Sequence, residues 1–223
     1  MKPWNKAYTE AGWFVRRGIG GSSVANGRLN WTIAASSVAM ELPSVLLDID
    51  LRDPALGSAL SSSDVPSRLP VMTCVKSDLW EHRQEYTFVD DAKEIRWISA
   101  LTNGARAGST NDMLVGSDQR SLVLERMTDT DLPTTEARYW AIGERFLGGN
   151  DFVRLLGSPY WLTEPMRCKC SCGGEMKMTV CVGSEGATRE PLFGHEPFFI
   201  GEAALYWFVC WPCRRVVVLP QST

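Results

Sequence analysis

Histidine is nearly absent from this chain, which has only His82 and His195 among its 223 residues. A catalytic zinc ion usually has a histidine ligand and keeps one position for water, and Ser-His-Asp or Cys-His mechanisms need a histidine base. No Gly-x-Ser-x-Gly segment is present either. His195 lies in the loop-like segment 193–197, where we expect an ordinary loop side chain rather than a ligand or a base. We therefore predict that the protein is not an enzyme.

Long apolar runs are also missing. No stretch reaches the roughly 18 uninterrupted apolar residues of a membrane span, and the first ten residues lack the apolar core of a signal peptide. The longest candidate, 203–219, is interrupted by Pro212 and by 214–215, a pattern that favours a hairpin. We expect a cytoplasmic protein with no membrane partner.

The chain has no excess of positive charge, since 23 basic residues face 26 acidic ones for a net charge of −3. Such a balance gives no overall attraction to a phosphate backbone, so nucleic acid would need a local patch. The tail offers one candidate patch for stacking bases and contacting phosphates. Its residues are Trp207, Trp211, Arg214 and Arg215.

Cysteine is the informative residue, because five of the seven fall in two clusters. Disulfides are rare in a reducing compartment, so the clusters indicate a metal site, whereas Cys74 and Cys181 are expected as small buried residues. Cys210-Trp-Pro-Cys213 has the two-residue gap of a zinc knuckle. In the upstream cluster, Cys168 can act with Cys172, or Cys170 can act with Cys172. The predicted ligands of a structural Zn²⁺ are therefore drawn from Cys168, Cys170, Cys172, Cys210 and Cys213.

Strand-like sequence connects the two clusters, as in a zinc ribbon. The residues Met176, Met178, Val180 and Val182 alternate with Lys177, Thr179 and Cys181, which predicts a strand that pairs with 204–209. The spare upstream cysteine would be a core residue, a group beside the ligands or a redox-sensitive thiol. A site closed by four thiolates stabilises the fold and leaves no position for catalysis. We expect the metal to be structural.

The rest of the chain predicts an α+β fold. Segment 45–53 alternates Leu47, Ile49 and Leu51 with charged residues, which indicates a half-buried strand. We predict helices at 90–101, capped by Asp90 or Asp91 and ended by Asn103-Gly104, and at 135–147, capped by Thr134 or Thr135. The expected architecture is a β-rich mixed domain with two or more helices over residues 1–157, followed by a zinc-ribbon-like β subdomain over 158–223.

Asp48 and Asp50 lie two apart on the strand in 45–53, so their carboxylates project from one face. Such a pair can bind a divalent metal or act in a hydrolase. Charged residues are also common on the solvent-exposed face of a sheet, where Arg52 would be the counter-ion of the two carboxylates. We favour this second interpretation.

Three short motifs in the last third of the chain resemble a family of uncharacterised, mostly β bacterial proteins. They are Leu156-Gly-Ser-Pro-Tyr-Trp161, Cys172-Gly-Gly-Glu-Met176 and Leu205-Tyr-Trp-Phe-Val-Cys210, which match a Gly-x-Pro-x-Trp turn, a Cys-Gly-x-x-Met strand and a closing aromatic strand. The family often has glutamine after the tryptophan, whereas Leu162 stands here, which argues against a ligand role for the turn. Proteins of this sort are similar to bacterial immunity proteins that bind a toxin, so the resemblance implies a protein partner.

The predicted function is therefore that of a non-enzymatic protein-binding protein, such as an immunity protein or antitoxin that neutralises a toxin or effector by direct binding. An acidic surface would suit a basic nuclease. The alternatives are a nucleic-acid-binding zinc ribbon and, ranked last, a hydrolase that uses Asp48, Asp50 or His195.

Overall fold

The computed structural model describes residues 10–26, 30–34, 43–60, 63–74, 83–100, 119–188, 190–194 and 196–223, and in these it has one α-helix, two 3-10 helices and a sheet of 13 strands. The helices are α1 (Glu136–Phe146), η2 (Pro54–Leu60) and η4 (Asp129–Asp131). The strands are β1 (Trp13–Arg17), β2 (Ser23–Ala25), β3 (Thr32–Ala34), β4 (Ser44–Asp50), β5 (Arg68–Thr73), β6 (Gln84–Val89), β7 (Glu94–Ala100), β8 (Arg120–Arg126), β9 (Val153–Leu155), β10 (Cys168–Lys169), β11 (Glu175–Val182), β12 (Ala203–Cys210) and β13 (Arg215–Ser222).

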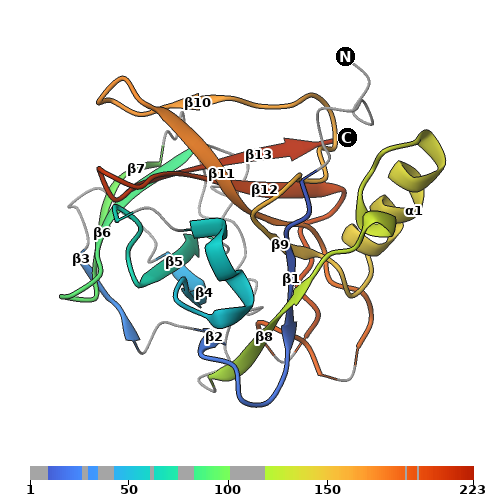
Figure 1. Ribbon diagram of the computed structural model, residues 1–223, viewed down its shortest axis with the longest axis horizontal. Helices are drawn as coiled ribbons and strands as arrows, with labels where there is room; N and C mark the ends of the chain where they lie inside the picture. The colour runs from blue at the N-terminus through green and yellow to red at the C-terminus, as the bar shows by residue number, and fades with distance from the viewer. Residues whose placement is uncertain are drawn as a thin grey trace.

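The strands form a strongly curved sheet in the order β3-β7-β6-β13-β12-β11-β9-β1-β8-β2-β4-β5, with β10 added to β11 (Figure 1). Neighbours are antiparallel except β3 and β7, which are parallel. The curvature brings β5, at one end of the order, against β6. The Tyr86 hydroxyl donates to the Pro70 carbonyl at 2.7 Å and accepts from the Met72 amide at 3.2 Å. The concave face thus encloses a core.

The predicted α+β class with two or more helices is wrong, because the molecule is β-rich and the segment 90–101 provides a strand rather than a helix. Strand β7 pairs with β6, and within it Ile95 and Trp97 are buried while Arg96 is exposed. Burial therefore alternates from one residue to the next, as in a strand. The sequence suggested a helix because Ile95 and Ile98 are three residues apart. Asp90 accepts hydrogen bonds from the amide and hydroxyl of Ser67 instead of capping a helix. The proposed stop at 103–104 lies outside the described residues.

The helix predicted at 135–147 is confirmed as α1, and its start follows the expected capping chemistry. The Thr135 hydroxyl accepts the Arg138 amide at 3.3 Å, which satisfies one free donor of the first turn. Tyr139, Ile142 and Phe146 form its buried stripe. Together with Tyr160 and Trp161 they cover the convex face of the sheet over β11 to β13.

Strand β12 is buried along its whole length because both of its faces are covered. Leu205, Trp207 and Val209 point into the concave core, and Tyr206 and Phe208 point into the second core under α1. This explains why its sequence is continuously apolar rather than alternating. Strands on both sides of residue 157 pair within this sheet, through β9 with β11 and β6 with β13. The division into domains at residue 157 stays a prediction.

Strand β11 does not keep one face as its alternation predicted, because a β-bulge interrupts it. Met178 pairs with Phe208 but Val180 pairs with Trp207, so Thr179 is an extra residue. A bulge shifts the side-chain alternation by one position. Met178 therefore packs on the convex face, whereas Val180 points into the concave core.

We predict that Gly143→Ala destabilises the protein, although alanine favours helix. A Cβ at this position of α1 would lie 2.3 Å from the Tyr160 hydroxyl oxygen, in a packed core. The free energy of unfolding, measured by urea denaturation, should fall by about 1–3 kcal/mol. The loss should be smaller in a Tyr160→Phe background, and Gly148→Ala, whose new Cβ meets nothing closer than 3.9 Å, serves as the control. If Gly143→Ala lowered the unfolding free energy equally in the wild type and in the Tyr160→Phe variant, a clash with the Tyr160 hydroxyl would not be the cause.

Glu185 holds the loop between β11 and β12. Its carboxylate accepts the Leu192 amide at 2.8 Å and the Phe198 amide at 3.1 Å, and the residue is only 8% exposed. Burial raises the pKa of Glu185, and this outweighs the lowering by the two amides and by the nearby Arg120. The folded state therefore favours the protonated carboxyl.

We predict that the Glu185 carboxyl contributes less to the stability of the fold as the pH rises. A group whose pKa is raised by folding stabilises fully below its unfolded pKa, and that contribution is lost as pH rises through the folded value. The difference in unfolding free energy between wild type and Glu185→Gln should therefore decline from pH 4 upward in urea titrations. A difference that grew with pH over this range would contradict the raised pKa.

Candidate metal centre

Two β-hairpin turns carry the clustered cysteines. In the first, β10 pairs with β11 so that Cys168 faces Met176. The turn between them is closed by the Cys170 amide, which donates to the Gly174 carbonyl at 2.9 Å, and by the Gly173 amide, which donates to the Cys170 carbonyl at 2.9 Å. Gly173 has φ of 87°, which glycine adopts without strain. This tight turn places Cys170 and Cys172 on the same side.

In the second hairpin, β12 pairs with β13 so that Cys210 faces Arg215. The connecting turn, 211–214, is closed by the Arg214 amide, which donates to the Trp211 carbonyl at 3.2 Å. Arg214 takes the left-handed conformation with φ of 51°. Cys213 lies in this turn, so its sulfur faces back toward Cys210, as a zinc knuckle requires.

Pairing of β11 with β12 brings the two turns together, and both hairpin tips lie at the left of Figure 1. The Sγ atoms of Cys170, Cys172, Cys210 and Cys213 all lie within 4.8 Å of one another, and the Cys172 and Cys210 sulfurs are 3.8 Å apart. A tetrahedral site with metal–sulfur bonds of about 2.3 Å needs sulfurs about 3.8 Å apart. These four cysteines could therefore bind a metal ion.

Cys168 is not part of this group. It is 4% exposed and its sulfur lies 3.5 Å from the Met176 Sδ atom, inside the core under α1. Burial raises the pKa of Cys168, which keeps it a thiol. Of the two upstream pairings that the sequence left open, the geometry brings together Cys170 and Cys172. Cys74 and Cys181 are buried, at 2% and 0% exposed.

The thiols of the group perturb one another's protonation. Burial opposes ionisation of Cys170, but hydrogen bonds from the Cys172 amide and from the other three thiols lower its pKa to about 7. Hydrogen bonding to the neighbouring sulfurs raises the pKa of Cys213 to about 12, and burial raises that of Cys210. Without a metal ion, Cys170 therefore ionises most readily while Cys210 and Cys213 keep their protons, and a cation that binds the group must displace these protons.

Arg215 connects this group to the rest of the sheet. Its guanidinium donates to the Ser171 hydroxyl at 2.7 Å, between two of the sulfur-bearing residues, and to the Glu85 carboxylate on β6. The hydrogen bond to Glu85 and the nearby thiols of Cys170 and Cys213 raise the pKa of Arg215. The arginine therefore offsets part of the negative charge that four thiolates would create.

Three of the four side chains in the candidate nucleic-acid patch make contacts within the protein. Trp207 is fully buried and donates from its indole to the Met72 carbonyl at 2.9 Å, so it has no free face for a base. Arg214 donates to the Trp211 carbonyl at 2.8 Å and to the Asp64 carbonyl. Arg215 makes the contacts described above.

The Asp48 and Asp50 pair has a different counter-ion from the one expected. Asp48 is fully buried, and its carboxylate accepts the Arg68 Nε donor at 2.8 Å and the Asn30 amide at 3.4 Å. Asp50 lies 3.9 Å from the Arg68 guanidinium and accepts the backbone amide of Arg52 at 2.9 Å. An arginine on β5, rather than Arg52, is therefore the counter-ion of both carboxylates. His82 and His195 lie outside the described residues.

Comparison with protein-family models, with curated proteins and with solved structures found no match. In the described ranges, no helix combines the length and the apolar character that crossing a membrane requires. The resemblance to the bacterial immunity-type family therefore stays a prediction.

We predict that metal content separates the four grouped cysteines from Cys168. Purified wild-type protein should contain about one metal ion per chain by elemental analysis, and Cys172→Ala or Cys210→Ala should remove it, since three thiolates remain. Loss of the ion should lower the melting temperature by on the order of 10 °C. Cys168→Ala is the matched control and should keep the ion. If Cys168→Ala lost the ion and Cys172→Ala kept it, Cys168 rather than Cys172 would be the ligand.

Proposed function

We propose that the protein is a non-enzymatic binding protein whose tail is held by a structural Zn²⁺ ion. The observation that supports this most is the convergence of four cysteine sulfurs from two hairpin turns. Thiolates favour zinc, and four of them complete its tetrahedron without a place for water or substrate. The ion then fixes the relative position of two turns that are separated by the whole β11–β12 connection.

The surface best suited to a partner is the exposed side of α1. Trp140 on this side is 59% exposed, although tryptophan is among the residues that anchor protein interfaces most often. Glu136 and Glu144 lie one turn before and one turn after it, and both are exposed. The small residues Ala137 and Ala141 lie beside them and leave the indole accessible.

The charged residues one turn from Trp140 are carboxylates, and the arginines of α1 make their contacts elsewhere. Arg145 binds Asp151 at 2.7 Å and Asp131 at 3.3 Å. Arg138 donates to the Asp129 carbonyl at 3.1 Å. The two glutamates beside Trp140 have no such partner among the described residues. An aromatic anchor between two carboxylates favours a protein with a basic surface, such as a nuclease toxin.

We predict that binding of such a partner depends on this side of α1. Immobilised wild-type protein should retain a basic protein from a bacterial lysate, and the purified partner should bind Trp140→Ala at least about 30-fold more weakly by calorimetry. The double variant Glu136→Lys/Glu144→Lys should also lose the partner, because it reverses the charge.

Ile19→Ala is the matched control for an exposed apolar side chain, since Ile19 is fully exposed and lies far along the chain from α1. It should bind like the wild type. If the retained protein is acidic, or if Trp140→Ala and the charge reversal bind it unchanged, the proposed surface is wrong.

A further inference from the structure

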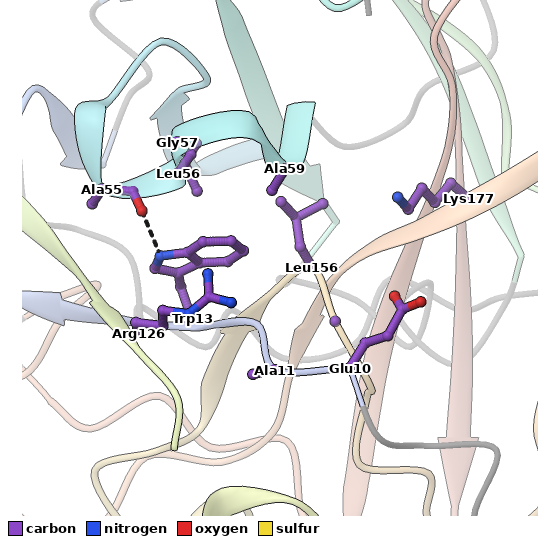
Figure 2. A pocket seen from close by; sticks show the side chains of 11 residues that line it. Glu10, Ala11, Trp13, Ala55, Leu56, Gly57, Ala59, Arg126, Leu156 and Lys177 are labelled. Carbon is purple, nitrogen blue, oxygen red and sulfur yellow. Dashed lines mark hydrogen bonds between the residues drawn. The ribbon is translucent and has the colours of Figure 1, made fainter. Parts of the chain in front are cut away.

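A cleft of about 520 Å³ lies away from the cysteine group and from α1, between the entry to β1, the 3-10 helix η2 and strand β11 (Figure 2). Its volume falls in the range of small-molecule sites. Small apolar side chains of η2 form one wall, and the turn after β9 forms another. The lining residues that bear on its chemistry are Glu10, Ala55, Ala59, Arg126, Leu156 and Lys177.

The bulge in β11 is what directs Lys177 to this cleft. Val180 and Val182 point into the concave core, so a regular strand would place the odd-numbered Lys177 on the convex face. The extra residue Thr179 reverses that alternation, and Lys177 therefore shares the concave side with the cleft. Bulges are frequent beside binding sites for this reason, since they re-aim one side chain.

The turn after β9 is held in an uncommon conformation. Leu156 has φ of 56° and Gly157 has φ of 64°, a left-handed pair in which leucine is strained. The Leu156 amide donates to the Thr179 carbonyl at 2.6 Å, and the Ser158 amide donates to the Glu10 carbonyl at 2.8 Å. These bonds join the turn to the bulge and to the segment before β1. This wall of the cleft is therefore held in place by the fold itself, before any ligand binds.

Two cations of the cleft have no anionic partner in the part of the chain that the structure describes. Arg126 lies over the Trp13 ring, with its guanidinium carbon 4.9 Å from the ring centre, and the indole is fixed by a 2.9 Å hydrogen bond to the Ala55 carbonyl. Within the described residues, no carboxylate lies within ion-pair distance of Arg126 or Lys177. With Glu10, the lining has a net charge of +1.

The arginines of the adjacent strand β1, in contrast, do have carboxylate partners. On β1, Arg16 pairs with Glu125 at 2.9 Å and Arg17 pairs with Glu190 at 3.1 Å. Arg126 has no such partner among the described residues, so its guanidinium donors are available while its face lies on the indole. A fixed, unpaired arginine beside apolar walls is a site for an anion that also has an apolar part.

We propose that this cleft binds a small organic anion, independently of the function proposed for α1. Arg126 and Lys177 attract the carboxylate, sulfonate or phosphate group. Ala55, Ala59 and Leu156 contact the apolar part. Trp13 is only 2% exposed, so it positions Arg126 rather than stacking on the ligand.

The test uses 8-anilinonaphthalene-1-sulfonate, a fluorescent dye with a sulfonate and an apolar body, on the folded full-length protein. Wild type should bind one dye per chain. Arg126→Gln and Lys177→Gln should each weaken binding about fivefold, the scale of one exposed charge interaction. Glu10→Gln should strengthen binding about twofold, because it removes an opposing charge. Arg167→Gln, which removes an exposed arginine outside the cleft, is the matched control and should change nothing.

Ala59→Trp locates the dye, because residue 59 is exposed and a larger side chain there fills the cleft without disturbing the core. Binding should be lost while the melting temperature stays that of the wild type. Inorganic phosphate should compete only weakly, since it lacks the apolar part. Unchanged binding by Ala59→Trp, or equal binding by the two cation variants and the wild type, would overturn the proposal.

Discussion

The register between β11 and β12 is the constraint on which the molecule depends most. Pairing of Lys177 with Val209 places two hairpin turns at the same end of the strands, and this brings four cysteine sulfurs together. The bulge at Thr179 then shifts the remaining pairs by one residue, so that Val180 meets Trp207. A slip of one residue would turn every side chain of β11 to the opposite face. The same slip would separate the cysteines and direct Lys177 away from the cleft.

Burial of β12 on both faces explains much of the remaining architecture. Its concave side belongs to the core closed by the curved sheet, and its convex side is covered by α1 and by the aromatic turn before β10. The Tyr206 hydroxyl donates to the Tyr160 carbonyl at 2.7 Å, and its ring stacks on Trp161 at 4.7 Å. The Gly-x-Pro-x-Trp turn is therefore a packing element here. Its aromatic residues hold the helix on the sheet.

Some of the charged side chains form ion pairs that maintain the fold, whereas those at the two proposed binding surfaces form none within the described part of the chain. Arg68 neutralises the buried Asp48, and Arg215 joins the turn of Cys170 and Cys172 to Glu85. Because buried charges are costly without partners, these pairs are structural. The exposed glutamates around Trp140 and the cations of the cleft have no such role. The metal ion that we propose would bind between the four cysteines, so it would occupy neither the side of α1 that carries Trp140 nor the cleft.

The sequence by itself determined those features that depend on neighbouring residues. The capped helix at 135–147 and the Cys210–Cys213 knuckle were predictable because a hydrogen bond to Thr135 or a two-residue gap is local. The helix predicted at 90–101 was wrong because pairing with β6 overrode spacing within one segment. Only the tertiary structure decided between Cys168 and Cys170, replaced Arg52 by Arg68 and revealed the cleft. Each of these depends on register between strands distant in sequence, and one strand's own residues do not encode its partner's position.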